Sequence, residues 1–514
     1  MGKAISNKAN IWLTGSTFAL FCLSVAGMIT AGAPRPTGDD LFFIGPAIGL
    51  LKSGNLINPY TQTWLADFGT SYFYVQGPVY FYTQAGWFYL FGLSTLSIIA
   101  FHWLVYIAGV ACLVIFLRRV AVPTYIGFLA GILFILSFGK DLRPEPLSCA
   151  LAFGALLLWE VRLKTQSAWW FNSKAFFSVF LMGLSILTYP LALAFIPPFV
   201  LLLHVNNDSS KSVSAWQIIK ERLVPFCVAG LAVVTVLALM VHGHVIQFLH
   251  VLLMHRNLRA SGILNAFPEF WKSITEYNEW ILTAPCFVLF AVIGAGAVIN
   301  RFLFREGDQK HNNIAASCFI AVALGIFLYP ERAQVLGEVF ALVSILIFLE
   351  RWVPRRLPWI LWINVIFGVA IILQLQFLLL LSFWYQLPPS PGNIEFVQHE
   401  LKFTQKTICI DGAVARYVFD YRLPDNAVSF LYGMGSRAQN ACERRQPFTI
   451  CIHDVSLKSP DEIWAASQSS FIFADGSDVI HGLPAEFYVY KTIKVFGRSF
   501  NSLPEQPFKL LVYK

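Results

Sequence analysis

Long apolar runs, separated by short polar stretches, fill most of the first 384 positions of the chain. A helix needs about 17 to 25 predominantly apolar residues to cross a bilayer, and most of the runs are close to this length. The pattern therefore predicts a polytopic α-helical membrane protein with about eleven transmembrane helices. We place them at 11–31, 95–117, 121–138, 145–160, 174–189, 191–205, 223–242, 281–299, 314–329, 333–350 and 358–383.

Composition and charge agree with this class. Hydrophobic residues make up 57% of the chain and charged residues 13%, which leaves too much apolar surface for an aqueous domain of this length. Lysine and arginine are more frequent in the polar stretches that would be cytoplasmic if the N-terminus were inside, such as the one at Arg355 and Arg356. The net charge of +8 is explained by these loops and by their contact with membrane lipids, so no nucleic acid is expected as a partner.

This orientation decides which parts of the chain face outward. With a cytoplasmic N-terminus and an odd number of spans, three parts of the chain lie outside an inner (plasma) membrane. They are the first loop (about 32–94), the segment 243–280 and the C-terminal tail (about 385–514). Residues 1–33 also resemble a signal peptide. We expect a retained anchor, because Pro34 disfavours cleavage and removal would reverse the parity of the remaining spans.

The composition changes after position 384. A Pro-rich linker at 388–392 leads into a stretch where short apolar runs alternate with Gly, Asp and Pro, which is typical of strands and turns. We expect two domains, a transmembrane module over 1–384 and a small C-terminal extracytoplasmic α/β domain over 385–514, with helices beginning after Gly412 and Pro460. Its candidate strands are 407–410, 427–431, 448–452, 470–473, 488–495 and 509–513.

Three of the nine cysteines, Cys409, Cys442 and Cys451, fall in this outer domain. One disulfide with one free thiol is compatible with an oxidising compartment, and Cys442 with Cys451 is the preferred pairing. The sequence contains neither G-x-x-x-x-G-K-[ST] nor G-x-G-x-x-G, so chemistry driven by a bound nucleotide is not expected.

Two adjacent carboxylates, Asp39 and Asp40, lie within ten residues of the end of the first span. At a membrane face, such a pair suits a general base or a cation ligand acting on a lipid-borne substrate. The alternative is a helix N-cap, because aspartate before Leu41-Phe42-Phe43 would satisfy free backbone N–H groups. The two roles are compatible with each other.

The first loop as a whole resembles a known family. The acidic pair precedes an apolar stretch ending in Lys52-Ser53-Gly54-Asn55, then Asn58-Pro59-Tyr60, then Gln76-Gly77-Pro78, then Phe91-Gly92. This order is similar to that of the GT-C glycosyltransferases that use polyprenyl-phosphate sugars, such as the protein mannosyltransferases and the lipid A aminoarabinose transferases. The resemblance covers about residues 10–160, and the later spans only by hydropathy.

The resemblance implies an inverting glycosyltransferase. Asp39 aligns with the family's catalytic loop aspartate and Asp40 with the acid that follows it, so Asp39 is the candidate base that removes a proton from the acceptor hydroxyl. The expected donor is a polyprenyl-phosphate sugar. The acceptor is an extracytoplasmic glycolipid such as lipid A or its core, another envelope glycan, or a protein.

A departing phosphate needs positive charge at the membrane face, which arginine or lysine can supply. Arg143 and Arg332 are the preferred candidates, and each could instead extend to the interface without a functional role. Arg143 lies in Arg143-Pro144-Glu145-Pro146-Leu147, which also resembles family members, and Asp141 or Glu145 is a candidate second acid. The remaining candidate cations are Arg256, Arg259 and Lys272.

The chain departs from the family at Gln76-Gly77-Pro78, where relatives often have a proline pair, and no lysine before this motif matches the one that some relatives use near the phosphate. A divalent cation held by Asp39 and Asp40 is possible and no metal is assigned. Four histidines lie near one span end, but positions i and i+2 do not share a helix face, and we interpret them as interfacial. They are His242, His244, His250 and His255.

Two other classes remain as alternatives. A transporter or flippase for lipid-linked glycan would carry acids deep in its spans, whereas Glu338 is the one obvious acid in that position here. An O-antigen ligase or polymerase would place its essential Arg and His residues in a large late loop, for which 243–280 is the candidate. The gathering of charge at one membrane face favours the transferase.

Overall fold

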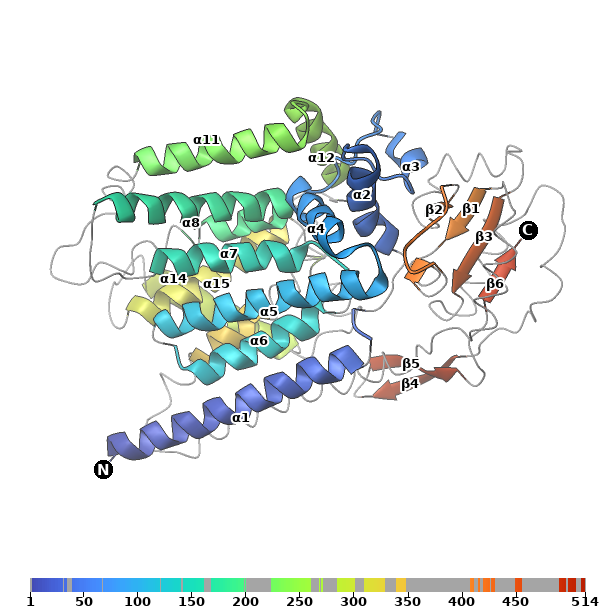
Figure 1. Cartoon of the computed structure of the whole chain (residues 1–514). Helices are drawn as coiled ribbons and strands as arrows, with labels where there is room; N and C mark the ends of the chain where they lie inside the picture. The colour runs from blue at the N-terminus through green and yellow to red at the C-terminus, as the bar shows by residue number, and fades with distance from the viewer. Residues whose placement is uncertain are drawn as a thin grey trace.

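The fold of the 514-residue chain is given by a computed structural model. Helices dominate the described part before position 348, and the named strands lie after position 406 (Figure 1). The structure describes residues 2–30, 32–34, 39–66, 68–120, 122–139, 142–160, 168–197, 199, 223–259, 268, 270, 284–300, 309–328, 339–347, 407–410, 415–416, 419–425, 427–429, 449–454, 490–495, 498–504 and 510–513.

Apolar helices make up most of the described chain. Three are long and apolar enough to cross a bilayer: Asn10–Thr30, Thr95–Arg119 and Leu223–Met240. The helices at the predicted spans are α1 (Gly2–Thr30), α5 (Thr95–Arg119), α6 (Thr124–Phe138), α7 (Glu145–Glu160), α8 (Ala168–Thr188), α11 (Leu223–Met240), α14 (Ala284–Ile299) and α15 (Gln309–Leu328). Most of these helices begin or end within a few residues of the positions predicted from hydropathy.

Two of the remaining predicted spans can be judged only in part. The described beginning of 191–205 is a 3-10 helix, η1 (Pro190–Phe195), because Pro190 interrupts the hydrogen bonding of α8 and starts a new turn. Of 333–350 the structure describes 339–347, which is helical, and 358–383 lies outside the described residues.

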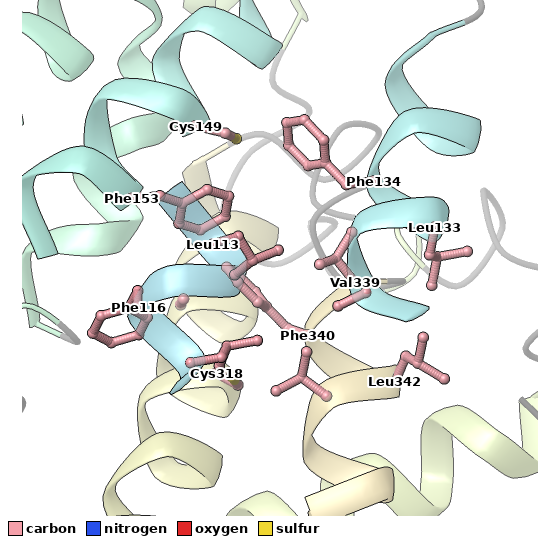
Figure 2. Packing of buried hydrophobic residues seen from close by; sticks show 14 of the residues in the cluster. Leu113, Phe116, Leu133, Phe134, Cys149, Phe153, Cys318, Val339, Phe340 and Leu342 are labelled. Carbon is pink, nitrogen blue, oxygen red and sulfur yellow. The ribbon is translucent and has the colours of Figure 1, made fainter. Parts of the chain in front are cut away.

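The bundle is held together by side chains from α5, α6 and α7. In Figure 1, α5 lies beside α6 and α7, α8 packs against α7, and α1 packs along α6. Figure 2 shows Phe116, Phe134, Phe153 and Phe340 among the side chains of the buried cluster in this part of the bundle. Gly109 of α5 lies against the ring of Phe134, so a small residue allows the two helices to approach closely.

The helices of the first loop lie together at one end of the bundle, on the side where the strands of the tail are found (Figure 1). They are α2 (Asp40–Ser53), α3 (Gln62–Ala66) and α4 (Pro78–Phe91). Gly54 ends α2 with a φ of 73°, a left-handed conformation in which glycine has no steric penalty. The segment 243–280, expected as a loop, begins instead with a helix, α12 (Val245–Arg259).

A proline inside α2 is compensated by an asparagine of the following turn. Pro46 has no N–H, so the carbonyl of Phe42, four residues earlier, loses its helical donor. The buried amide Nδ2 of Asn58 donates to the carbonyls of Leu41 at 3.0 Å and Phe42 at 3.4 Å. Gly45 packs directly on this amide. Asn58 therefore fixes the first turn of α2, which carries the acidic pair.

This packing predicts a stability effect. In Gly45→Ala the new Cβ would overlap the Asn58 amide, and we expect a loss of about 1–3 kcal/mol in the free energy of unfolding. Gly86→Ala in α4 is the matched control, because open space surrounds that position and alanine favours a helix. Thermal unfolding of the purified full-length protein measures both. Equal midpoints for Gly45→Ala and Gly86→Ala would contradict the assignment.

The tail contains a four-stranded sheet of order β2-β1-β3-β6 and a separate β4-β5 hairpin. β1 pairs in parallel with β2 and β3, and β6 pairs antiparallel with β3. The predicted strands are confirmed at five positions, and β5 was not predicted. Of the helix expected after Gly412 the structure describes residues 415–416, which are helical, whereas 470–473 and the helix expected after Pro460 lie outside the described residues. The strands are β1 (Thr407–Ile410), β2 (Ala427–Ser429), β3 (Thr449–Asp454), β4 (Tyr490–Val495), β5 (Arg498–Pro504) and β6 (Leu510–Tyr513).

The register of the sheet bears on the cysteines. Cys409 of β1 and Cys451 of β3 are direct partners across the parallel pair. Cys442, the predicted partner of Cys451, lies outside the described residues. The pairing predicted for Cys442 and Cys451 therefore stays a prediction.

Candidate active site

Asp39 occupies the N-cap position of α2 but does not cap the helix with its side chain. Its backbone is helical, with φ of −80° and ψ of −9°, and no cap hydrogen bond is made by the carboxylate. The backbone carbonyl of Asp39 instead accepts from the N–H groups of Phe42 and Phe43 at 2.9 and 3.1 Å. The N-cap interpretation is therefore wrong for this side chain, whose carboxylate is directed to an arginine of another loop.

That arginine is Arg143, which comes from the turn before α7. Its Nη2 donates to Oδ2 of Asp39 at 2.8 Å, although 104 residues separate the two along the chain. The guanidinium also lies 5.3 Å from the ring centroid of Phe43, within the range of a cation–π contact. The side chains of Arg143 and Asp39 are 16% and 25% exposed, so the pair is partly shielded and still accessible from outside the protein.

Glu145 supplies a second carboxylate on the other side of Arg143. Its Oε1 lies 3.9 Å from Nη1 of Arg143, and the residue is buried at the first turn of α7, where the helix dipole favours a negative charge. Among the residues that the structure describes, its Oε2 has no hydrogen-bond partner. A buried acceptor of this kind is suited to a hydroxyl or amino group of a substrate.

Asp40 points to a different environment from Asp39. It is fully buried, and its Oδ2 accepts a hydrogen bond of 2.6 Å from the hydroxyl of Tyr421, in the tail. The two neighbouring carboxylates therefore have separate partners, one an arginine near the surface and the other a buried tyrosine.

A buried tyrosine of α4, Tyr80, lies near Asp40 and Glu145 and was not predicted from sequence. Burial raises the pKa of the Tyr80 hydroxyl well above its ordinary value of 10.0, and the neighbouring Tyr106, Glu145 and Asp40 raise it further. The hydroxyl lies 2.9 Å from Nε2 of His102, whose Nδ1 is 2.8 Å from the carbonyl of Ile98. Because a carbonyl accepts, Nδ1 carries the proton and Nε2 accepts from Tyr80. Tyr80 stays neutral beside the carboxylates.

The turn that departs from the family pattern is closely packed. Pro78 is at the first position of α4, where a missing N–H costs nothing, and Gly77 lies against the backbone of Leu187 and Thr188 at the end of α8. A side chain at position 77 would collide with that backbone. The glycine therefore allows the first loop to rest directly on the bundle.

Several predicted site residues cannot be compared with this geometry. Asp141, Lys272 and Arg332 lie outside the described residues, and for Arg256 and Arg259 the structure describes only the backbone, on α12. α12 itself contacts the first loop, since the ring of His255 packs against Trp64 and Phe68. His255 is thus a buried residue that packs on the first loop.

In the described part of the chain, no group of three or more His, Cys, Asp or Glu side chains is placed to hold a metal ion. Asp39 and Asp40 direct their Oδ2 atoms to Arg143 and Tyr421. Beside Asp39, positive charge is supplied by the guanidinium of Arg143.

The fold and the site together define a multi-pass helical membrane protein with two carboxylates and an arginine gathered at one end of its bundle. No protein-family model and no curated protein sequence matches the chain. Among solved structures it is similar to ArnT from Cupriavidus metallidurans in the apo state, with a TM-score of 0.45, and bound to undecaprenyl phosphate, with a TM-score of 0.46. In both, the identity is 13% and the match covers 96% of this chain and 97% of the other.

Proposed function

We propose that the protein is an inverting membrane glycosyltransferase of GT-C type, which moves a sugar from a polyprenyl-phosphate donor to an acceptor outside an inner membrane. The observation that carries the proposal is the meeting of Asp39, Arg143 and Glu145, from two loops, at the end of the bundle that holds the first-loop helices. An accessible carboxylate beside a guanidinium provides a base and a binding site for phosphate within a few ångströms of each other.

The reaction assigned to this site is a single displacement. The acceptor hydroxyl attacks the anomeric carbon and its proton passes to Asp39, while the bond from that carbon to the phosphate oxygen breaks. The polyprenyl phosphate leaves with the electron pair from the opposite face, so the configuration inverts. Arg143 binds the departing phosphate, and pairing with Asp39 before the reaction keeps the two groups oriented.

Glu145 is assigned to substrate binding. Its buried Oε2 accepts a hydrogen bond from the sugar, and its charge keeps the guanidinium of Arg143 between the two acids. Asp141, Arg256, Arg259 and Arg332 remain candidate contacts to phosphate or acceptor. In this proposal, residues 1–384 form the catalytic module and 385–514 an extracytoplasmic α/β domain.

A transporter would require a polar route through the bundle. Between α5, α7 and α15 the described structure instead has a cavity of about 50 Å³ with an apolar lining, which includes Leu113, Phe153 and Phe340. The charged groups near the bundle's end support a reaction site, and this apolar cavity offers no path to a polar glycan.

The test is a comparison of envelope glycolipids and glycoproteins by mass spectrometry in a deletion strain. The strain carries an empty vector, the wild type, Asp39→Asn or Asp425→Asn at matched expression. Asp425 is an exposed carboxylate paired with Lys52 and serves as the control. We expect a sugar-sized mass that the wild type and Asp425→Asn restore and Asp39→Asn does not. Full restoration by Asp39→Asn would contradict the proposed function and favour the transporter.

A further inference from the structure

The segment 415–427 of the tail is fastened to three separate parts of the membrane module. Residues 415, 416, 419–425 and 427 of it are described. Its side chains reach the end of α1, the start of α5 and the last turn of α2. The bonds run from Arg416 to the carbonyls of Pro34 (2.7 Å) and Gly32 (3.0 Å), from the Thr95 N–H to Asp420 (2.6 Å), from Arg422 to the Leu93 carbonyl (3.1 Å) and from Lys52 to Asp425 (2.7 Å).

The same segment is buried against α2. Its four buried residues belong to one apolar cluster with residues of the first loop and with Leu142, which precedes Arg143. The burial of these apolar side chains holds the segment against α2. The exposed ion pair between Lys52 and Asp425 contributes little to this stability. The members from the segment are Ala415, Tyr421, Leu423 and Ala427, and those from α2 include Leu41, Ile44, Ala47 and Ile48.

Within this contact, Tyr421 makes a hydrogen bond to the acidic pair itself. Its hydroxyl donates to Oδ2 of Asp40 at 2.6 Å, and the two residues are 1% and 0% exposed. A donor to a buried carboxylate makes a short and strong bond and restricts the carboxylate to one orientation. Because Asp40 adjoins Asp39 in the chain, its orientation also restrains the position of Asp39.

The backbone at this point adopts a conformation that non-glycine residues avoid. Asp420 has a φ of 50° and Tyr421 a φ of 59°. Two consecutive residues in the left-handed region cost free energy, and such conformations persist only where the surroundings determine them. Here Asp420 accepts from the N–H of Thr95, and Tyr421 donates to Asp40. The strained turn thus directs both side chains to the membrane module.

We infer that the segment 415–427 completes the active site and that Tyr421 is a positioning residue for Asp40. The inference deepens the proposed function and rests on it. Tyr421 does not touch the reacting atoms. Its hydroxyl fixes Asp40, and through Asp40 the first turn of α2, so that Asp39 meets the acceptor hydroxyl.

The experiment is a double-mutant cycle in the full-length chain. Tyr421→Phe, Asp40→Asn and the combined variant are expressed in the deletion strain, and the initial rate of product formation after induction is measured per amount of folded protein. Tyr60→Phe is the control, because Tyr60 is buried in the same apolar cluster and its hydroxyl is not assigned to the site. Thermal unfolding of the purified proteins provides a second cycle that does not depend on activity.

We expect Tyr421→Phe to lower the rate by about tenfold or more, and to lower it by less than about twofold further when Asp40 is already asparagine. Tyr60→Phe keeps the wild-type rate. An unchanged rate in Tyr421→Phe, or an equal loss in both backgrounds, would overturn the inference. If the wild type yields no product, the proposed function fails. The unfolding cycle then still tests the contact, which is supported by non-additive midpoints and contradicted by additive ones.

Discussion

Replacing Asp39 with asparagine is expected to slow sugar transfer by about 10²- to 10⁴-fold, the range that a general base contributes. The amide has the shape of the carboxylate and its oxygen can still accept from Nη2 of Arg143, so the local structure is kept. What is lost is the ability to take the proton from the acceptor hydroxyl. The measurement is the initial rate of product formation by the purified full-length protein in lipid nanodiscs, once mass spectrometry has identified the product.

Two further variants serve as comparisons for Asp39→Asn. Asp39→Glu keeps the base but moves it by one methylene, and we expect it to retain more activity than Asp39→Asn. Asp425→Asn removes an exposed carboxylate at the same end of the bundle, bonded to Lys52, and we expect a rate within about twofold of the wild type. A wild-type rate in Asp39→Asn would remove Asp39 from the mechanism.

Replacing Arg143 with glutamine should reduce kcat/KM by about 10²- to 10³-fold, the loss typical of removing one group that stabilises developing charge. The change also leaves Asp39 and Glu145 without the cation between them. Arg143→Lys keeps the charge but cannot reach both acids with separate nitrogens as a guanidinium does, so we expect an intermediate rate. Binding of undecaprenyl phosphate in nanodiscs should weaken in the same order.

The control for arginine is Arg118→Gln. Arg118 is exposed in the last turn of α5, at the opposite end of that helix from Thr95. It should keep most of the activity and of the phosphate binding. If Arg118→Gln and Arg143→Gln were equally impaired, the effect would be one of general surface charge, and the assignment of Arg143 to the leaving phosphate would be withdrawn.

Much of this architecture follows from sequence because it is written in local patterns. The length of an apolar run predicts a helix such as α5 or α11 without knowledge of its neighbours. The αL residue that ends α2 is a glycine, Gly54, as its place after an apolar stretch predicts. Asp39, Arg143 and Glu145 were each named from their position at a membrane face, but their contact was not, since no local pattern encodes a distance across 104 residues.

The residues that sequence did not reveal act over long separations or look ordinary. Tyr421 stands in a run of charged and aromatic residues that resembles any surface turn, and its partner is 381 positions away. Pro46 indicates that one carbonyl of α2 needs a hydrogen-bond donor from outside the helix. Only the fold of the next turn shows that Asn58 is this donor. Likewise, Tyr80 and His102 fall within apolar stretches, where a polar pair is indistinguishable from two packing residues until both are placed.

The separation of 381 positions between Asp40 and Tyr421 also determines the order in which the parts of the site are synthesised and assembled. A ribosome completes the acidic pair early and delivers Tyr421 only after the intervening spans have been made. Contacts of such long range form late, once the parts they join are already assembled. On the proposed function, a nascent chain inserted in the membrane therefore has its carboxylates before it has the hydrogen bond from Tyr421 that orders them, and it gains catalytic competence only when the tail has been made and has docked.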